Sequence, residues 1–216
     1  MKEQLLNNPN KQSRLLDYIK LDFTDYSVGE QNIYNQGVGN IDFITYNPTA
    51  SSQVIDHPTY GKVFQFMGDQ HFYTDKPAGL FNTNYQIKIE FVPLFTRGAL
   101  RLLLTGDFPP NSDIRDGFCI FLNQYADRYL QLFCMGPGSH YNRLFLPGFV
   151  EPVLETCIIT YIDNVMFFES LRTNEKTSLA LSNINQDNPL LIGGGYYIAS
   201  PGNFIGLLKS LKIDLL

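Results

Sequence analysis

The sequence predicts an all-β protein, an antiparallel two-sheet β-sandwich of the jelly-roll type. Short apolar runs recur at roughly ten-residue spacing and are separated by Gly, Pro, Asn and Asp, as in sandwiches. Aromatic residues make up 14% of the 216 residues, with 17 Phe, 13 Tyr and no Trp, and they favour strands. Helical periodicity is almost absent. Because one core of this size is common among β-sandwiches, residues 17–216 are expected to form a single domain.

The segment 157–170 predicts a β-hairpin. Two runs of β-branched and aromatic residues flank Asp163 and Asn164, which tolerate the positive φ of a tight turn. Further on, residues 190–192 precede three glycines, which predicts a strand that ends in a turn. From Leu211 onward apolar residues alternate with polar ones, so the last segment is expected to be a strand within a sheet.

The most regular alternation in the chain lies in residues 85–93. Its odd-numbered positions are apolar, whereas Gln86, Lys88 and Glu90 are polar, which indicates an antiparallel strand with one wet face. Other predicted strands are 18–23, 41–46, 62–66, 72–73, 100–105, 117–123 and 129–135. Residues 24–41 are expected to be a loop.

Charge and the N-terminal residues limit the partners and the location. A net charge of −5 and an isoelectric point near 5.1 disfavour binding to nucleic acid. No secretory signal and no membrane span are visible, so we expect a protein made as a soluble intracellular product without membrane insertion. Residues 1–16 carry two leucine pairs. They are either a frayed arm or an arm that docks on another subunit.

Three cysteines, Cys119, Cys134 and Cys157, each lie in an apolar run. Cysteine in such runs usually behaves as a small buried hydrophobe, so buried free thiols are expected. The alternative is one disulfide with one unpaired cysteine.

Four stretches together resemble a known family of domains. Residues 85–93 alternate into an aromatic residue and then Pro, and residues 158–164 form a Tyr-Ile-Asp-Asn hairpin. Residues 190–194 contain Leu-Leu-Ile-Gly, and residues 204–213 follow a Phe-x-Gly pattern that closes the chain. In this order the stretches resemble laminin-G-like and concanavalin A-like lectin/glucanase jelly-roll domains, over nearly all of the chain after residue 16.

The resemblance implies a two-sheet jelly roll whose relatives mostly bind glycans or proteins without chemistry, in some cases through a calcium ion at the rim. Comparable domains also occur in phage virion and tail proteins. The resemblance therefore implies a recognition or attachment module, and fold analogy alone does not decide function.

The sequence offers no reacting centre. The catalytic relatives of this fold are glycosidases, which need two carboxylates on one strand face, and no such run is present. Glu151 and Glu155 are expected to be a solvated pair at the entry to a strand. His57, His71 and His140 are isolated, which argues against a zinc site. We expect no enzymatic activity; a glycosidase would need two carboxylates about 5–10 Å apart in a cleft.

One acidic segment has the ligand types of a calcium site, although acidic loops are usually just solvated. Hard oxygen ligands at short spacing can wrap Ca²⁺. The residues concerned are Asp107, Asn111, Asp113 and Asp116.

Three loops combine tyrosine with polar groups, as a sugar site requires. The alternative is that each Tyr caps the sandwich edge. The candidate residues are Tyr125, Asp127, Arg128, His140, Tyr141, Arg143, Tyr196 and Tyr197. The leading hypothesis is a non-catalytic module that binds a glycan or a host-surface receptor, as a virion or tail component. The rival is a structural or decoration subunit that uses the arm and one sheet face to contact other subunits, its own copies included.

Overall fold

The computed structural model describes residues 16–47, 51–74, 83–94, 99–107, 115–123, 129–135, 141–146, 152–181, 190–194 and 203–216. Within these ranges every regular element is a strand except η3 (Phe23–Asp25), one turn of 3-10 helix. The predicted arm, residues 1–16, lies outside the described residues apart from Leu16, which opens the first strand.

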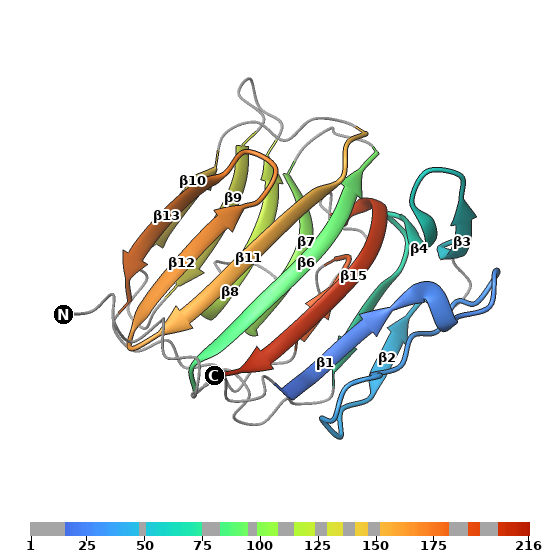
Figure 1. Ribbon diagram of the computed structural model, residues 1–216, viewed down its shortest axis with the longest axis horizontal. Coiled ribbons are helices and arrows are strands. Elements are labelled where there is room, and N and C mark those ends of the chain that lie inside the picture. Colours follow the sequence, from blue (N-terminus) through green and yellow to red (C-terminus); the bar gives the residue numbers. More distant parts are fainter. Residues whose placement is uncertain are drawn as a thin grey trace, which may run out of the picture.

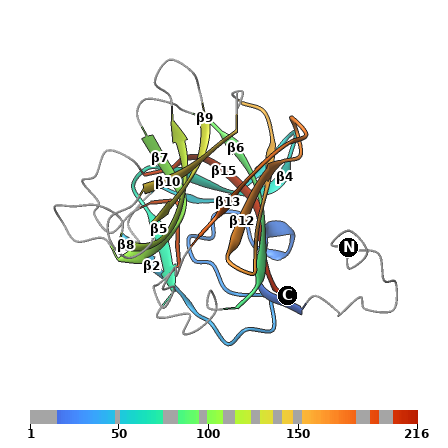
Figure 2. The ribbon, with the colours of Figure 1, turned by 90° about the vertical axis from the view of Figure 1, so that its left-hand side faces the viewer.

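The strands form two antiparallel sheets, which confirms the predicted fold class (Figures 1 and 2). The first sheet has the order β13 (Glu175–Ala180), β12 (Val165–Ser170), β11 (Glu155–Ile162), β6 (Tyr85–Pro93), β15 (Ile205–Leu215), β4 (Gly61–Met67) and β3 (Gln53–His57), and β1 (Leu16–Asp22) also pairs with β15. The second sheet has the order β10 (Tyr141–Leu146), β9 (Tyr129–Met135), β8 (Arg115–Asn123), β7 (Ala99–Asp107), β14 (Leu190–Ile192), β5 (His71–Thr74) and β2 (Phe43–Tyr46). Viewed edge-on in Figure 2, the two sheets form two layers.

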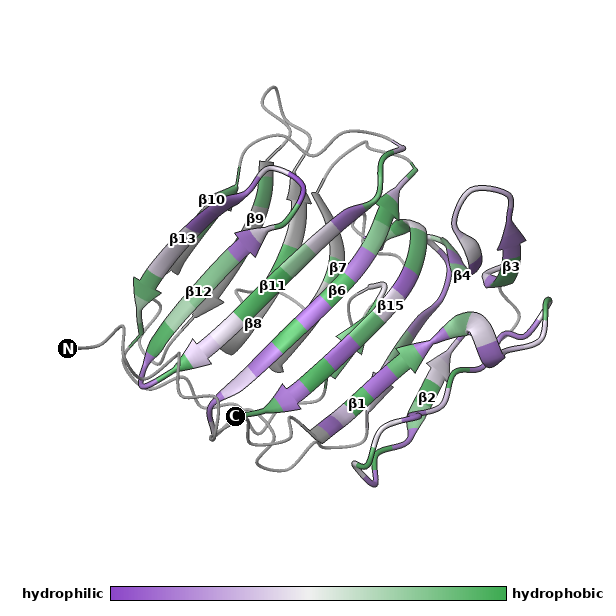
Figure 3. Ribbon diagram, in the orientation of Figure 1, coloured by the Kyte–Doolittle hydropathy of each residue, from purple (hydrophilic) through white to green (hydrophobic). Residues whose placement is uncertain are grey.

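The predicted alternation of β6 places one set of its side chains in the core between the sheets. Tyr85, Ile87, Ile89 and Phe91 are fully buried. Their polar neighbours are half-buried on the opposite side, which we call the outer face of the first sheet. Figure 3 shows the same alternation of hydrophobic and hydrophilic residues along β6 and β15. The polar residues of these strands are thereby aligned on one surface.

The predicted hairpin is confirmed. β11 and β12 pair antiparallel, and their turn consists of Asp163 with φ +49° and Asn164 with φ +65°. Two consecutive positive φ angles match the right-handed twist of the flanking strands. Cys157 on β11 is buried and free, as expected, and burial raises the pKa of its thiol, assisted by the nearby Glu155 carboxylate. The side chains of Cys119 and Cys134 lie outside the described part.

Packing of the core requires a glycine directly after β14. Gly193 has φ +86°, and a Cβ at this position would run into the ring of Phe66 in the core. Gly206 is equally restricted, because a Cβ there would meet the Phe204 ring and the Val92 carbonyl. The Ile-Gly and Phe-x-Gly stretches therefore mark places where the core approaches the backbone closely.

The structure corrects three expectations. Residues 140–143 were expected to be a loop, but Tyr141 and Arg143 belong to the strand β10. Two further strands, β3 and β13, have no counterpart in the predicted set. Glu155 was expected to be solvated; instead it begins β11, is 1% exposed and accepts hydrogen bonds from Ser170 and Arg172. Its sequence neighbours gave no sign of these two distant donors.

Candidate functional site

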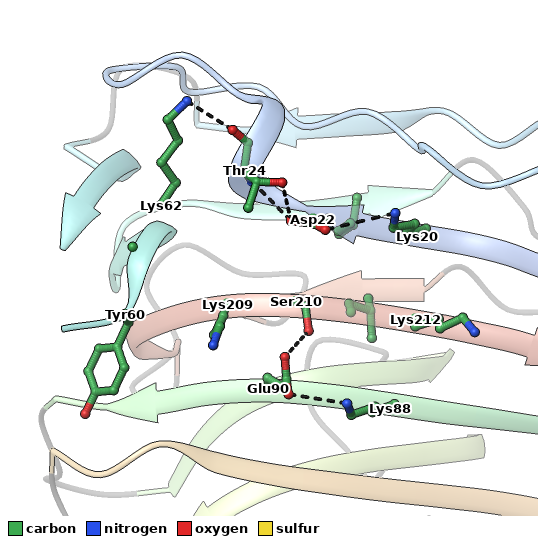
Figure 4. A pocket seen from close by; sticks show the side chains of 13 residues that line it. Lys20, Asp22, Thr24, Tyr60, Lys62, Lys88, Glu90, Lys209, Ser210 and Lys212 are labelled. Atoms are coloured by element: carbon green, nitrogen blue, oxygen red, sulfur yellow. Dashed lines mark hydrogen bonds and ion pairs between the residues drawn. The ribbon is translucent and has the colours of Figure 1, made fainter. Parts of the chain in front are cut away.

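The outer face of the first sheet carries a hollow of about 350 Å³, close to the lower limit of common ligand pockets, roughly 300 Å³. β1, β4, β6 and β15 contribute to it, together with Thr24 in η3 (Figure 4). "The hollow" below denotes this set of residues: Lys20, Leu21, Asp22, Thr24, Tyr60, Gly61, Lys62, Lys88, Glu90, Lys209, Ser210, Leu211 and Lys212.

The hollow lies where β15 changes its neighbour. Residues 205–208 of β15 pair with β4, and residues 210–215 pair with β1. Lys209 falls between the two pairings, and on the other side of β15 the register with β6 shifts between Leu208 and Ser210. A bulge of this kind redirects side chains and locally interrupts pairing. The junction therefore leaves a depression on the sheet and directs Lys209 toward it.

Two rows of polar side chains cross three strands at this place. In the first row, the acidic row, Asp22 of β1 is opposite Ser210 of β15, which is opposite Glu90 of β6. In the second, the lysine row, Lys20 is opposite Lys212, which is opposite Lys88. Neighbouring strands lie about 4.8 Å apart, so each row spans roughly 10 Å.

Three like charges in one row would repel each other, and carboxylates on both sides offset this repulsion. Lys20 lies 4.0 Å from Asp22, and Lys88 lies 3.4 Å from Glu90. The Lys212 ammonium contacts two carboxylates beyond the row, at 2.7 Å to Asp17 and 3.1 Å to Asp214. These contacts partly neutralise the three lysine charges, most strongly that of Lys212.

The two carboxyl groups of the hollow are ionised at neutral pH. Burial pushes the pKa of Asp22 upward, but hydrogen bonds from Thr24 and the charges of Lys20 and Lys209 outweigh it and the pKa is lowered. For Glu90, burial is likewise outweighed, by the Ser210 hydroxyl at 2.7 Å and by Lys88 and Lys209, so its pKa is also lowered. Both groups therefore act as hydrogen-bond acceptors.

Two lysines of the hollow have no carboxylate contact among the described residues. The Lys62 ammonium donates to the backbone carbonyls of Thr24 at 3.1 Å and Tyr26 at 2.7 Å. Lys209 has no hydrogen bond or ion pair to any described residue. Its charge interacts with the carboxylates of Asp22 and Glu90 only at longer range. Figure 4 shows Lys209 beside Ser210 on β15.

Tyr60 forms an apolar wall at one end of the hollow. Its ring stacks on His57 with centroids 4.8 Å apart and packs against the outer-face cluster of Val63, Val92 and Leu207. Its hydroxyl donates to the Pro152 carbonyl at 2.8 Å. Since these contacts hold the ring in place, Tyr60 closes the hollow on one side.

Most of the sugar-site residues predicted from the sequence lie outside the described residues: Tyr125, Asp127, Arg128, His140, Tyr196 and Tyr197. Tyr141 and Arg143 have a described backbone in β10, and their side chains lie outside the described part. The role of all eight residues stays a prediction.

The residues of the predicted calcium site also lie only partly within the described residues. Asp107 ends β7 opposite Arg115 of β8, so Asp116 is adjacent to it across the two strands. Asn111 and Asp113 lie outside the described residues, as does the loop between those strands. Within the described part of the chain, no three His, Cys, Asp or Glu side chains are grouped closely enough to hold a metal ion. In the same part, no helix is long and apolar enough to cross a membrane.

A short motif that occurs three times marks outward-facing residues of the three strands around the hollow. The chain has Lys-Leu-Asp at 20–22, Lys-Ile-Glu at 88–90 and Lys-Ile-Asp at 212–214. β1 and β6 are both antiparallel to β15, so the three lysines align in one row. Asp214 of β15 therefore lies on one side of this row, and Asp22 and Glu90 lie on the other. The motif predicts the outward residues of each strand, whereas their alignment depends on pairings between distant parts of the chain.

No protein-family model and no curated protein matches this sequence. Solved structures do match the fold. Domain 4 of AbnA, a GH43 extracellular arabinanase from Geobacillus stearothermophilus, in complex with arabinotriose, is 12% identical with a TM-score of 0.66, covering 92% of this chain and 91% of that one. The botulinum neurotoxin serotype D binding domain is 10% identical, TM-score 0.66, covering 93% of this chain and 48% of that one.

A phage protein also has this fold. The enzymatically active domain of bacteriophage CBA120 tailspike protein 2 is 8% identical with a TM-score of 0.58, and the match covers 91% of this chain and 31% of that one. The present chain thus spans about half of the neurotoxin domain and a third of the tailspike domain. At these identities the similarities establish the β-sandwich fold.

Proposed function

We propose that this protein is a non-catalytic recognition module that binds a glycan in the hollow on the outer face of the first sheet. The observation that carries the proposal is the pair of rows, in which ammonium donors and carboxylate acceptors alternate along neighbouring strands at fixed positions. Sugars present many hydroxyl groups that both donate and accept hydrogen bonds, and charge-assisted hydrogen bonds to them are the strong ones.

The rigidity of the hollow supports this role. The Lys212 ammonium contacts two carboxylates, the Glu90 carboxylate accepts a hydrogen bond from Ser210, and the Tyr60 ring stacks on His57. A site whose side chains are already ordered loses less conformational entropy on binding. The similarity to a domain solved with arabinotriose supports a sugar ligand at the level of the fold.

The charges of the hollow favour binding over hydrolysis. Asp22 and Glu90 stand about two strand spacings apart, roughly 10 Å, near the upper limit for inverting glycosidases, about 9.5 Å. Such an enzyme needs one protonated carboxylic acid to donate to the leaving oxygen. The pKa of both groups is lowered, so neither holds a proton at neutral pH.

A blocking variant tests the site. Ser210→Tyr puts a large uncharged side chain in the middle of the acidic row, and Ser178→Tyr puts the same side chain on the outer face of β13, away from the hollow. On a glycan array, the wild type and Ser178→Tyr should bind the same glycans, and Ser210→Tyr should lose them. If Ser210→Tyr binds as the wild type does while remaining folded, the hollow is not the site.

A second function is supported by the tailspike similarity. In this proposal the chain is a component of a phage virion or tail, and acts there as a structural subunit through the arm and one sheet face. The mass in solution of the chain with and without residues 1–15 tests it. An assembly that falls apart on truncation supports this function, and a monomer in both cases contradicts it.

A further inference from the structure

We propose that the hollow selects acidic glycans, whose carboxylate or sulfate group sits against Lys209 at the end closed by Tyr60. This inference rests on the proposed function and names its ligand class. Five lysines and two carboxylates line the hollow, in a chain whose net charge is −5. Asp17 and Asp214 just outside the hollow also contact Lys212, so the local excess of positive charge rests on the lysines that have no carboxylate contact.

The lysines of the hollow differ in how much of their charge is neutralised. Lys20 and Lys88 each face a carboxylate on their own strand, and Lys212 lies between two. The Lys62 ammonium uses two of its three donors on neutral carbonyls, which leave its charge in place. The Lys209 ammonium has no short-range contact with any described residue.

The free ammonium group of Lys209 lies where the sheet is already interrupted. Lys209 occupies the position between the β4 and β1 pairings, and Lys62 is the second residue of β4. Lys209 is half-buried, so an anion bound to it is partly shielded from water and its attraction to the ammonium group is less screened. A neutral sugar in the same place leaves the Lys209 charge without a short-range counter-ion.

The aromatic contribution points to the same ligand class. Neutral glycans usually gain much of their binding energy from stacking on an exposed aromatic face. The Tyr60 ring already stacks on His57 and packs against the outer-face cluster, so it provides a wall and little free face. Charge-assisted hydrogen bonds are then the main source of affinity that the hollow offers.

The experiment compares three ligands that share one neutral core: lactose, sialyllactose and sulfated lactose, together with an array of neutral and acidic glycans. Four variants accompany the wild type. Lys209→Gln removes the free charge, Lys209→Arg keeps it, and Glu90→Gln removes a nearby negative charge. Lys176→Gln makes the same change as Lys209→Gln on β13, where Lys176 is exposed and remote from the hollow.

The expected result is binding of acidic glycans that weakens as salt is added. Lys209→Gln should weaken it about fivefold, the upper range for a partly exposed charge pair. Lys209→Arg should bind acidic glycans as the wild type does, and Lys176→Gln should leave their binding unchanged. Glu90→Gln should strengthen their binding. Preference for sialylated over sulfated members, or the reverse, identifies the anionic group.

Two results overturn the inference, and they are distinguishable. If neutral glycans bind as tightly as acidic ones and Lys209→Gln has no effect, while Ser210→Tyr abolishes binding, the proposed function stands and the acidic preference is wrong. If no member of the array binds the wild type, both are wrong.

Discussion

Two charged regions on the first sheet have opposite designs. At the start of β11, the Glu155 carboxylate is 2% exposed and accepts hydrogen bonds of 2.6 Å from both Arg172 and Ser170. In the hollow, by contrast, Lys209 is half-buried and has no short-range contact with any described residue. In the first region the charged groups pair with each other, whereas in the second the Lys209 charge is not paired with a neighbouring carboxylate.

The difference shows how structural charges can be told from ligand-binding charges. Burying a carboxylate is costly unless partners compensate it, so Glu155 is stable only because Arg172 and Ser170 are in place. The Lys209 ammonium loses little hydration free energy on folding, because water still reaches it. Removing a charge should therefore affect stability in the first region and ligand binding in the second.

Arg172→Met is expected to have the largest effect on stability. It leaves the Glu155 carboxylate buried with only the Ser170 hydroxyl. Removing one partner of a buried pair costs about 3–5 kcal/mol, and because Arg172 is 25% exposed we expect about 2–4 kcal/mol in the free energy of unfolding. Urea unfolding measures it, and glycan binding of the folded variant should not change.

The control is Lys176→Gln. Its ion pair with Glu169 has a length of 3.3 Å and is exposed, so we expect a loss below about 0.5 kcal/mol. A loss below about 1 kcal/mol in Arg172→Met would mean that Glu155 does not depend on its partner, and the comparison would fail.

The sequence predicts much of the fold because strand faces are a local property. The alternation at 85–93 identified β6 and placed Lys88 and Glu90 on its wet face. β13 was missed because an exposed strand at the sheet edge, Glu-Lys-Thr-Ser-Leu-Ala, needs no apolar alternation. β10, also at an edge, begins with polar residues and was predicted as a loop.

The hollow was not predictable in the same way. It requires Asp22, Ser210 and Glu90 to align, and these residues come from opposite ends and the middle of the chain. The register also depends on the irregularity after Leu208, which no local pattern shows. A single sequence contains the three Lys-x-acid motifs but not the pairing that aligns them.

A second prediction concerns pH and uses two carboxylates of opposite behaviour. Since the pKa of Glu90 is lowered below its ordinary 4.5, its stabilising contribution is present above that pH and is lost as the pH falls through the folded-state pKa. Burial and the nearby Asp17 raise the pKa of Asp214 above 3.8 against the effect of Lys212. The contribution of Asp214 therefore declines as the pH rises through its folded-state pKa.

Glu90→Gln should consequently destabilise the protein at pH 7, by less than about 1 kcal/mol, and match the wild type in strong acid. Asp214→Asn should gain stability relative to the wild type as the pH rises from about 3 to 7. Unfolding free energies measured across this range check both signs. If the two variants show the same pH dependence, the carboxylates around the lysine row are equivalent and this account of them is wrong.

The smallest effect on stability is expected from Lys209→Gln. Because Lys209 has no hydrogen bond or ion pair to a described residue, its replacement should change the free energy of unfolding by less than about 0.5 kcal/mol. Urea unfolding beside Arg172→Met measures the contrast. A loss above about 1.5 kcal/mol would show that Lys209 is a structural charge, as Glu155 is.

The most direct test of a ligand site in the hollow is to map the contact surface by NMR, with the labelled protein titrated with a glycan that it binds on the array. The account predicts that the amide signals that shift belong to residues 20–24, 60–62, 88–90 and 209–212, and that those of β12 and β13 remain in place. Shifts confined to residues 124–128, 140–143 and 196–197 would place the site in the tyrosine-containing loops and would contradict it.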